Sequence, residues 1–589
     1  MHMALSIIKT SIKNQPGMSL VEVILAAAIF AVISTGVISA IIYGSESTAV
    51  AGARERATKI AEEGIEAVRN IRDSGYSNLP ADGTYGLTIA GGIWTFSGTS
   101  DMTDIFTRSI TLSTIDSRTR NITVNVAWTQ TVQRSGNLSL NTYLTDWVTP
   151  SITFRKGMLV YGDGGIISDA IKYQIYDDST GTWSAAAATA DVDTGSNNKY
   201  LRAARVFASP TRNEKILVSR HYNGTGQWIY AQVYNGTTNT WNTPVQLSTW
   251  NSSSYLNVQN FDATYTANGN LTVVYSDNST TPKSRIWNGT SWSSQSSLDN
   301  LGSSQIPTYL ITKSRPATNE IMLTAFTQAS DTITEYYSGT TWLSHISHST
   351  SAPLATKRLI DFDWSPQDIS KGLLVYSTSS SARAITSKIW TADGVGDGSW
   401  SSSGTSATQG NSATRLSALN VVGIKGLNEF QTCSENTFPQ IICYKTNFTP
   451  AFSNPTNQII APTTDTGIQK SFDTASELSG ANVISVYSDA SATAKLKQYN
   501  TLTSAWDVLP TNLNSLAVGS IKTARVESSP VNDDAMLFVS DNNTDLFSIA
   551  WNGTANALYT APAGKAWTAH GTSGSNIADY WYDFTWDGV

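Results

Sequence analysis

The sequence predicts an α+β module, made of one long N-terminal helix and an antiparallel sheet, followed by a larger all-β repeat domain. Three observations support this division. Residues 18–43 form an apolar run in which Glu22 carries the single charge. Residues 54–73 are charged but keep a helical spacing of apolar positions. The rest of the chain is rich in Ser, Thr, Asn, Gly and aromatic residues, with turn signals at regular intervals.

The apolar run is long enough to cross a bilayer as one helix, which takes about 20 residues. Gly17 stands directly before it, and Glu22 is the fifth residue counted from Met18. An ordinary secretory signal has a shorter apolar core with a cleavage site after it, whereas here the glycine precedes the run. A plain signal anchor is the alternative, but such a helix would not be expected to carry a charged residue such as Glu22. A carboxylate in hydrocarbon is costly and marks a function with a partner.

These residues resemble the class III signal of type IV pilins and pseudopilins. The resemblance implies that prepilin peptidase removes residues 1–17 by cutting after Gly17 and then methylates the new N-terminus at Met18. It also implies that the ammonium group of Met18 pairs with Glu22 of a neighbouring subunit during filament assembly. Breaking such a buried ion pair costs about 3–5 kcal/mol. Many family members carry phenylalanine where this chain has Met18.

Residues 44–148 are predicted to complete a pilin domain. The helix continues through residues 54–73, because Ile60, Val68 and Ile71 recur on one helical face. Strict alternation of apolar residues beyond this helix then predicts antiparallel strands. A long helix followed by a small antiparallel sheet is the fold that the resemblance implies.

Residues 149–589 are predicted to form a β-propeller-like repeat domain. A motif of turn residues followed by tryptophan recurs at intervals of about 50 to 60 residues, with one double-length gap before Trp506, and an apolar strand precedes each copy. Repeats of this length with about four strands each are typical of propeller blades. We expect eight blades, with seven as the alternative; a β-sandwich array or a β-solenoid is the alternative architecture. The motif tryptophans are Trp183, Trp241, Trp292, Trp342, Trp400 and Trp506.

The last apolar segment, residues 580–586, resembles residues 359–364, which open the fifth repeat. This similarity predicts that the end of the chain completes the first blade and seals the ring.

The two cysteines, Cys433 and Cys443, are predicted on facing strands of one hairpin. A disulfide is expected in an exported domain, and a pair of reduced, buried thiols is the alternative. Structural zinc uses four ligands, and the five histidines show no metal-ligand spacing. We therefore expect no metal and no cofactor.

The repeat domain is not expected to be an enzyme. Its motif is only partly similar to the Asp-box of sialidases: Asp178 and Gly181 come near it, but the glycine is misplaced. Glycoside hydrolysis needs two positioned carboxylates, and no candidate pair stands out, so a propeller glycosidase is the least favoured reading. Most repeat tryptophans are expected to pack between blades. Aromatic residues with Asn, Ser and Thr suit a glycan or protein ligand, and a net charge of −7 argues against nucleic acid.

Together with the resemblance, size favours a minor pilin. A globule of residues 149–589 has a diameter of about 55–60 Å and would crowd its neighbours if every filament subunit carried one. We expect a single-pass protein of the bacterial inner membrane that moves to the pilus and cell surface, with other pilin subunits as partners and adhesion or surface recognition as its role. The alternatives are a pseudopilin of a type II secretion-like machine, which primes assembly or contacts cargo, and a cap that limits filament growth.

Overall fold

The chain divides into two compact units, Met1–Ile152 and Thr153–Val589. The computed structural model describes residues 19–116, 119–131, 134–145, 156–162, 171–192, 199–350, 356–379, 382–393, 397–409, 414–449, 451–456, 458–462, 470–513, 519–572 and 581–588. The predicted leader, residues 1–17, and the predicted domain boundary near residue 148 lie outside the described residues.

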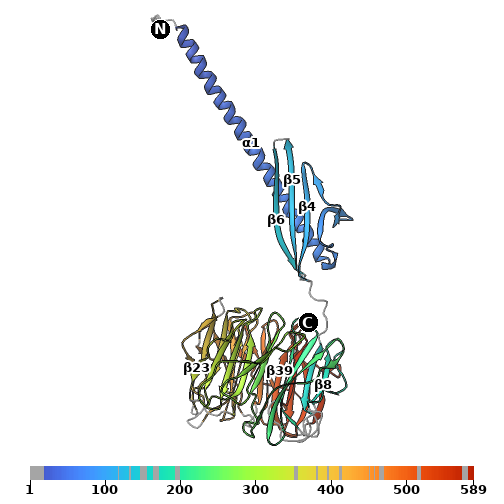
Figure 1. The fold of residues 1–589 in the computed structure, drawn as a ribbon, viewed down its shortest axis with the longest axis vertical. Coiled ribbons are helices and arrows are strands. Elements are labelled where there is room, and N and C mark those ends of the chain that lie inside the picture. The colour runs from blue at the N-terminus through green and yellow to red at the C-terminus, as the bar shows by residue number, and fades with distance from the viewer. Residues whose placement is uncertain are drawn as a thin grey trace, which may run out of the picture. The chain divides into compact units, whose positions relative to one another are not determined.

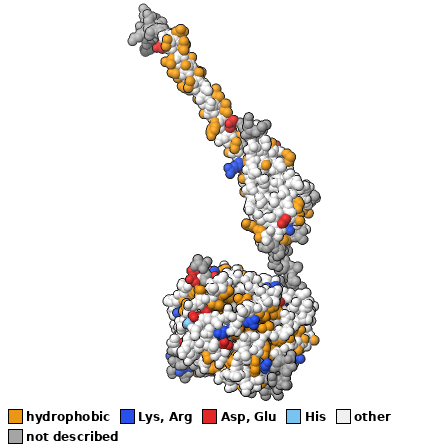
Figure 2. Space-filling model, viewed as in Figure 1, with side chains coloured by type: hydrophobic (Ala, Val, Ile, Leu, Met, Phe, Trp, Pro, Cys, Tyr) orange, Lys and Arg blue, Asp and Glu red, His pale blue; other side chains and the backbone are white. Residues whose placement is uncertain are grey.

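Helix α1 runs from Leu20 to Asp73. Its first turn is closed by a capping box: Glu22 donates its N–H to Ser19 Oγ at 3.2 Å, and Ser19 donates its N–H to Glu22 Oε2 at 2.9 Å. The first half of α1 presents exposed apolar side chains along its length (Figure 2). Within the described part of the chain, α1 is the one helix long and apolar enough to cross a membrane.

The second half of α1 packs against a six-stranded antiparallel sheet (Figure 1). The predicted face is confirmed, because Ile60, Val68 and Ile71 are all buried there. A short 3₁₀ helix (Tyr76–Asn78) follows α1. The sheet has the order β2-β1-β4-β5-β6, with β3 beside β4. The strands are β1 (Gly83–Ala90), β2 (Ile93–Ser97), β3 (Asp101–Thr103), β4 (Phe106–Asp116), β5 (Thr119–Thr131) and β6 (Arg134–Thr145).

Gly64 and Arg108 explain how closely the helix approaches the sheet. A Cβ at Gly64 would lie 3.0 Å from Arg108 Cδ and 3.1 Å from a methyl group of Val124, so a larger residue would push the layers apart. Arg108 is buried and donates from Nη1 to the carbonyl of Ile60 at 3.2 Å, while its Nη2 lies 2.9 Å from Asp101 Oδ1. The buried cation is thereby paired and also ties α1 to β4.

The second unit contains eight antiparallel sheets among its described residues, and we call them blades 1 to 8 in chain order. Blade 1 holds β7 (Lys156–Gly162), β8 (Ile171–Asp177), β9 (Thr182–Trp183), β10 (Ala187–Ala188) and β44 (Tyr582–Trp586). Blade 2 holds β11 (Tyr200–Ala208), β12 (Glu214–Tyr222), β13 (Gly226–Asn235), β14 (Thr240–Trp241) and β15 (Val245–Asn251). Blade 3 holds β16 (Phe261–Tyr265), β17 (Leu271–Tyr275), β18 (Lys283–Trp287) and β19 (Ser296–Ser297). Blade 4 holds β20 (Pro307–Ser314), β21 (Ile321–Thr327), β22 (Thr332–Tyr337) and β23 (Ile346–Ser349).

The other four blades follow the same plan. Blade 5 holds β24 (Ile360–Trp364), β25 (Lys371–Tyr376), β26 (Thr386–Ala392), β27 (Gly398–Trp400) and β28 (Gly404–Thr405). Blade 6 holds β29 (Leu416–Gly423), β30 (Glu429–Asn436), β31 (Gln440–Asn447), β32 (Phe452–Ser453) and β33 (Ile459–Ala461). Blade 7 holds β34 (Phe472–Ser476), β35 (Asn482–Tyr487), β36 (Lys495–Asn500), β37 (Ala505–Trp506) and β38 (Thr511–Asn512). Blade 8 holds β39 (Ile521–Ser528), β40 (Ala535–Asp541), β41 (Asp545–Asn552), β42 (Ala557–Leu558) and β43 (Thr568–Thr572).

The blades close into a ring, which makes the unit a β-propeller. Each inner strand contacts the inner strands of both neighbouring blades, in the order β44, β11, β16, β20, β24, β29, β34, β39 and back to β44. The prediction that the chain end completes the first blade is confirmed, since β44 pairs antiparallel with β7, from Tyr582 opposite Tyr161 to Trp586 opposite Gly157. The first and last segments of the unit therefore share one sheet.

The motif tryptophans pack on the third strands of the blades, toward the outside of the ring. Each lies opposite an aromatic residue that ends the third strand of its own blade. Several also contact a neighbouring blade, as predicted: Trp241 packs on Tyr173 of blade 1 with ring centroids 5.5 Å apart, and Trp183 packs on Phe538 of blade 8 at 6.3 Å. The opposed pairs are Tyr176–Trp183, Tyr234–Trp241, Trp287–Trp292, Tyr337–Trp342, Trp390–Trp400 and Tyr499–Trp506.

In blade 6, Cys433 of β30 lies directly opposite Cys443 of β31, and the two are joined by a disulfide. Both residues are fully buried. The bond links adjacent strands of one hairpin.

Phe584→Ala tests the closure of the ring by β44. Phe584 is 1% exposed and packs against Phe538 of blade 8 at 5.0 Å between ring centroids. Removing a buried ring leaves a cavity, so we expect the free energy of unfolding to fall by about 3–5 kcal/mol. Urea unfolding of the full chain in detergent, followed by tryptophan fluorescence, measures the change. The control, Phe438→Ala, removes a ring that is 48% exposed, and equal losses in the two variants would contradict this role of β44.

Candidate functional site

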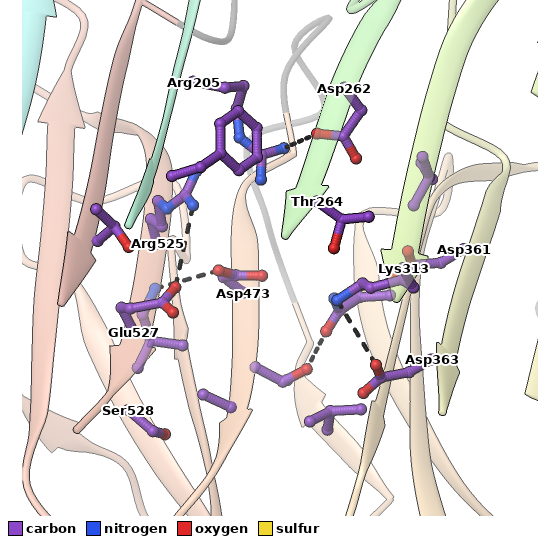
Figure 3. A pocket seen from close by; sticks show the side chains of 18 of the residues that line it. Arg205, Asp262, Thr264, Lys313, Asp361, Asp363, Asp473, Arg525, Glu527 and Ser528 are labelled. Atoms are coloured by element: carbon purple, nitrogen blue, oxygen red, sulfur yellow. Dashed lines mark hydrogen bonds and ion pairs between the residues drawn. The ribbon is translucent and has the colours of Figure 1, made fainter. Parts of the chain in front are cut away.

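A cavity of about 720 Å³ lies at the centre of the ring and is lined by residues of all eight inner strands. Its volume falls within the range of about 300–1,000 Å³ that is usual for small-molecule sites. Figure 3 shows that its walls carry acidic and basic side chains from opposite sides of the ring. Sequence analysis did not predict this site.

Four aspartates hold neighbouring inner strands together; three of them are buried and Asp473 is partly buried. They occupy equivalent positions on every second inner strand: β16, β24, β34 and β44. In each case one carboxylate oxygen accepts the backbone N–H of the next inner strand, so the blades are joined in four pairs. The bonds run from Thr312 to Asp262 at 2.9 Å, from Val421 to Asp361 at 2.9 Å, from Val526 to Asp473 at 3.2 Å and from Val206 to Asp583 at 2.8 Å.

Four cations balance these four carboxylates. The close pairs are Arg205 Nε to Asp583 Oδ2 at 3.0 Å, Arg358 Nη2 to Asp361 Oδ1 at 2.9 Å and Lys470 Nζ to Asp473 Oδ1 at 2.5 Å; Arg525 also pairs with Asp583. A buried charge is tolerated when it is paired and hydrogen-bonded. We call these eight residues the charge belt, and its formal charge is zero.

The pKa values of the aspartates follow the distance to these cations. Burial alone would raise the pKa of Asp473, but the nearby Lys470 and Arg525 hold it below its usual value. Burial raises the pKa of Asp262 above its usual value, since its nearest cation, Arg205, lies 3.6 Å from Oδ1. Figure 3 shows this longer contact across the boundary between two blade pairs.

A second layer of side chains lies two residues further along the inner strands. Alternate residues of a strand share one face, so this layer lines the same cavity as the charge belt. It contains Lys313, 3.6 Å from Asp363, and Glu527, 4.0 Å from Arg525. Both contacts are longer than a hydrogen bond. Burial raises the pKa of Glu527 to about 7, although Arg525 acts in the opposite direction.

Four polar atoms of the charge belt are buried without a hydrogen bond among the described residues. They include Asp262 Oδ1, an acceptor, and Arg525 Nε, a donor; Asp583 Oδ1 and Arg358 Nε are a second acceptor and a second donor of the belt in the same state. Buried polar atoms are usually satisfied by the protein or by ordered water. The cavity wall therefore has unused capacity both to accept and to donate.

No cluster of three or more His, Cys, Asp or Glu residues that could hold a metal ion occurs in the described part of the chain. In the charge belt each aspartate instead lies within 4 Å of at least one cation, and one oxygen of each accepts a backbone N–H of the next strand.

The predicted N-terminal site is described only from Ser19 onward. Gly17 and Met18, the predicted cleavage and methylation positions, lie outside the described residues. Glu22 is exposed on the first turn of α1 and is engaged with Ser19. The Ser19-x-x-Glu22 spacing is a capping-box signature, which sequence analysis had not recognised.

The four aspartates of the charge belt, though not their cations, share one repeated sequence signal. Each aspartate directly follows a large hydrophobic residue at the start of an inner strand, but the pattern recurs only in alternate blades, so the repeat is about twice the tryptophan interval. The four copies are Phe261-Asp262, Ile360-Asp361, Phe472-Asp473 and Tyr582-Asp583.

Comparison with family models shows that the chain carries the prokaryotic N-terminal methylation motif, over residues 12–38. Comparison with the sequences of curated proteins finds no match.

Solved structures similar to this chain include two lectins and a gluconolactonase. The BP39L lectin from Burkholderia pseudomallei has 10% identity and a TM-score of 0.46, covering 61% of this chain and 98% of its own. A periplasmic gluconolactonase from Pseudomonas aeruginosa has 9% identity and a TM-score of 0.37, covering 62% and 97%. The six-bladed Aleuria aurantia lectin has 13% identity and a TM-score of 0.30, covering 64% and 97%. Similarities this low transfer neither a ligand nor an activity to this chain.

Asp583→Ala tests the charge belt. The substitution leaves Arg205 and Arg525 without their shared carboxylate and removes the acceptor of the Val206 N–H. Removing one partner of a buried ion pair costs about 3–5 kcal/mol, and we expect the free energy of unfolding to fall by that amount. Asp507→Ala is the matched control, because Asp507 is exposed and accepts one backbone N–H, from Gln498, at 2.9 Å. We expect it to cost about 1 kcal/mol; similar losses at both sites would show that the belt does not stabilise the ring.

Glu527→Gln tests the raised pKa in the second layer. The usual pKa of 4.5 rises to about 7 in the folded chain, so the folded state holds a proton that the unfolded state has released. This contribution to stability is complete below pH 4.5 and is lost as the pH rises through 7. We expect the melting temperature of the wild type, measured relative to the variant, to fall between pH 4.5 and 8. A constant difference across that range would show that the pKa of Glu527 is not raised.

Proposed function

We propose that this chain is a minor type IV pilin-like subunit that displays its propeller at a pilus tip for adhesion or surface recognition. The observation that carries the proposal is the joining, on one chain, of an N-terminal methylation motif and an exposed apolar helix to a closed propeller. The first two features suit a filament core, whereas the propeller is a separate compact unit.

The N-terminal residues have defined roles in this proposal. Prepilin peptidase cuts after Gly17 in the inner membrane and methylates Met18. The mature subunit then enters a filament with other pilin subunits, where Glu22 pairs with the N-terminal ammonium group of a neighbour. The exposure of Glu22 on the first turn supports this role, because its carboxylate can exchange the Ser19 N–H for a charged partner.

The position at the tip follows from size. A unit of the length of Thr153–Val589 has a diameter of about 55–60 Å. Subunits whose helices pack side by side cannot each carry such a unit without collision. A single copy at a tip, or sparse copies along a filament, avoids this problem and exposes the propeller to the outside.

The propeller acts in this proposal by binding rather than by catalysis. General acid–base chemistry needs carboxyl groups that are free to exchange protons. The four aspartates of the charge belt are instead held by cations and backbone N–H groups. A wall whose aspartates are held in place suits recognition of a ligand on a surface.

A pseudopilin of a type II secretion-like machine is the second candidate, because the methylation motif is expected in both classes of subunit. In that role the chain would prime assembly or contact cargo within the cell envelope.

Immunogold electron microscopy of sheared surface filaments, with antibody against residues 153–589, distinguishes the two roles. We expect label at filament tips in the wild type and its loss in Glu22→Ala, because the variant lacks the carboxylate that docks the subunit. Glu46→Ala, which removes a carboxylate further along the same helix, is the control and should keep the label. Label along whole filaments would contradict the minor-subunit role, and label confined to the cell envelope would favour the secretion pseudopilin.

A further inference from the structure

We propose that the central cavity of the propeller binds an uncharged ligand rich in hydroxyl groups, of which the terminal sugar of a surface glycan is the form that adhesion requires. The proposal rests on the proposed function, since it names the ligand class that the displayed propeller recognises.

The charge belt disfavours charged ligands. Its four cations and four carboxylates are matched, and each carboxylate is also fixed to the backbone of the next strand. A phosphate or carboxylate that bound a cation of the charge belt would have to displace an aspartate from it. A free cation would compete with Arg205 and Arg525 in the same way. An uncharged ligand leaves every ion pair intact.

The unused hydrogen-bonding atoms specify the chemistry further. Asp262 is 4% exposed, and its Oδ1 accepts no hydrogen bond; Arg525 Nε donates none. A hydroxyl group both donates and accepts, so a ligand with several hydroxyls can serve the carboxylate and the guanidinium together. Both residues line the cavity and come from opposite sides of its wall in Figure 3.

The second layer combines polar groups with apolar surface, and a sugar needs both. Thr264, Lys313 and Glu527 supply polar groups, whereas Phe207 and Val422 supply apolar surface at the same level of the strands. Binding pockets for small molecules combine apolar surface with a few placed polar groups. A pyranose ring has the same division between its C–H faces and its hydroxyl edge.

The motif tryptophans do not offer an equivalent site. Each is packed on an aromatic residue of its own blade, and Trp183 and Trp241 are also packed on a neighbouring blade. These contacts give the tryptophans a part in holding the blades together, so we place the ligand in the central cavity, whose wall has polar atoms without a hydrogen bond.

Saturation-transfer NMR and titration calorimetry with the full chain in detergent test the proposal. The probes are neutral monosaccharides (glucose, galactose, mannose, fucose and N-acetylglucosamine), the polyol inositol, and the charged sugars glucuronate and glucosamine. We expect at least one neutral sugar to bind and the charged sugars to bind at least tenfold more weakly. A glycan array then distinguishes a free sugar from the terminal residue of a glycan.

Three variants locate the binding. Asp262→Asn keeps the size of the side chain and Arg525→Lys keeps its charge, while each changes one of the atoms that make no hydrogen bond. We expect each variant to weaken binding at least tenfold. Ala475→Gln adds a larger side chain to the cavity wall without removing an ion pair. It therefore still tests binding in the cavity if Asp262→Asn or Arg525→Lys fails to fold. Asp489→Asn is the control. Asp489 pairs with Lys495, with 3.6 Å between the two charged groups, and it does not line the cavity. This variant should bind within twofold of the wild type.

The proposal is overturned if no neutral sugar binds at millimolar concentration, in which case water alone satisfies the cavity wall. It is also overturned if charged sugars bind more tightly, or if the folded cavity variants bind like the wild type. Any of these results, with immunogold label still at filament tips, would remove the ligand assignment and leave the proposed function standing.

Discussion

The propeller depends on the pairing of four carboxylates, three of them buried, with four cations around its axis. A carboxylate taken from water without a partner is too costly to keep charged, so each aspartate must meet both a cation and a backbone N–H. Those bonds run to the following inner strand, over 50 to 60 residues for three of them and 377 residues for Asp583. The requirement fixes the spacing of neighbouring inner strands and makes pairs of blades, rather than single blades, the repeating unit.

Closure of the ring supplies the fourth of these pairings. Strand β44 brings Asp583 from the end of the chain to Arg205 near the start of the same unit. The charge belt is therefore incomplete until the last residues of the chain have been placed. Contacts of such high sequence separation are slow to form because loop closure must come first. The same closure creates the cavity, since its wall needs all eight inner strands.

Helix α1 meets two different environments along its length. Its first half exposes apolar side chains and suits a bilayer or the core of a filament, whereas its second half buries one face against the sheet and exposes charges on the other. In the second half, Gly64 allows the helix to lie close to the sheet, and Arg108 of the sheet donates a hydrogen bond to the helix backbone. A single helix can therefore be anchored at one end and carry a folded domain at the other.

Features with a local physical cause could be predicted from the sequence. Hydrophobic periodicity located α1 and its buried face at Ile60, Val68 and Ile71, and the spacing of Gly17, Met18 and Glu22 indicated the methylation motif. The recurring tryptophans indicated blades, because a cross-strand aromatic pair lies within one hairpin. The charge belt and the cavity were decided only by the tertiary structure. Which aspartate meets which arginine depends on how eight strands, spread over most of the chain, close around one axis, and no local pattern encodes that geometry.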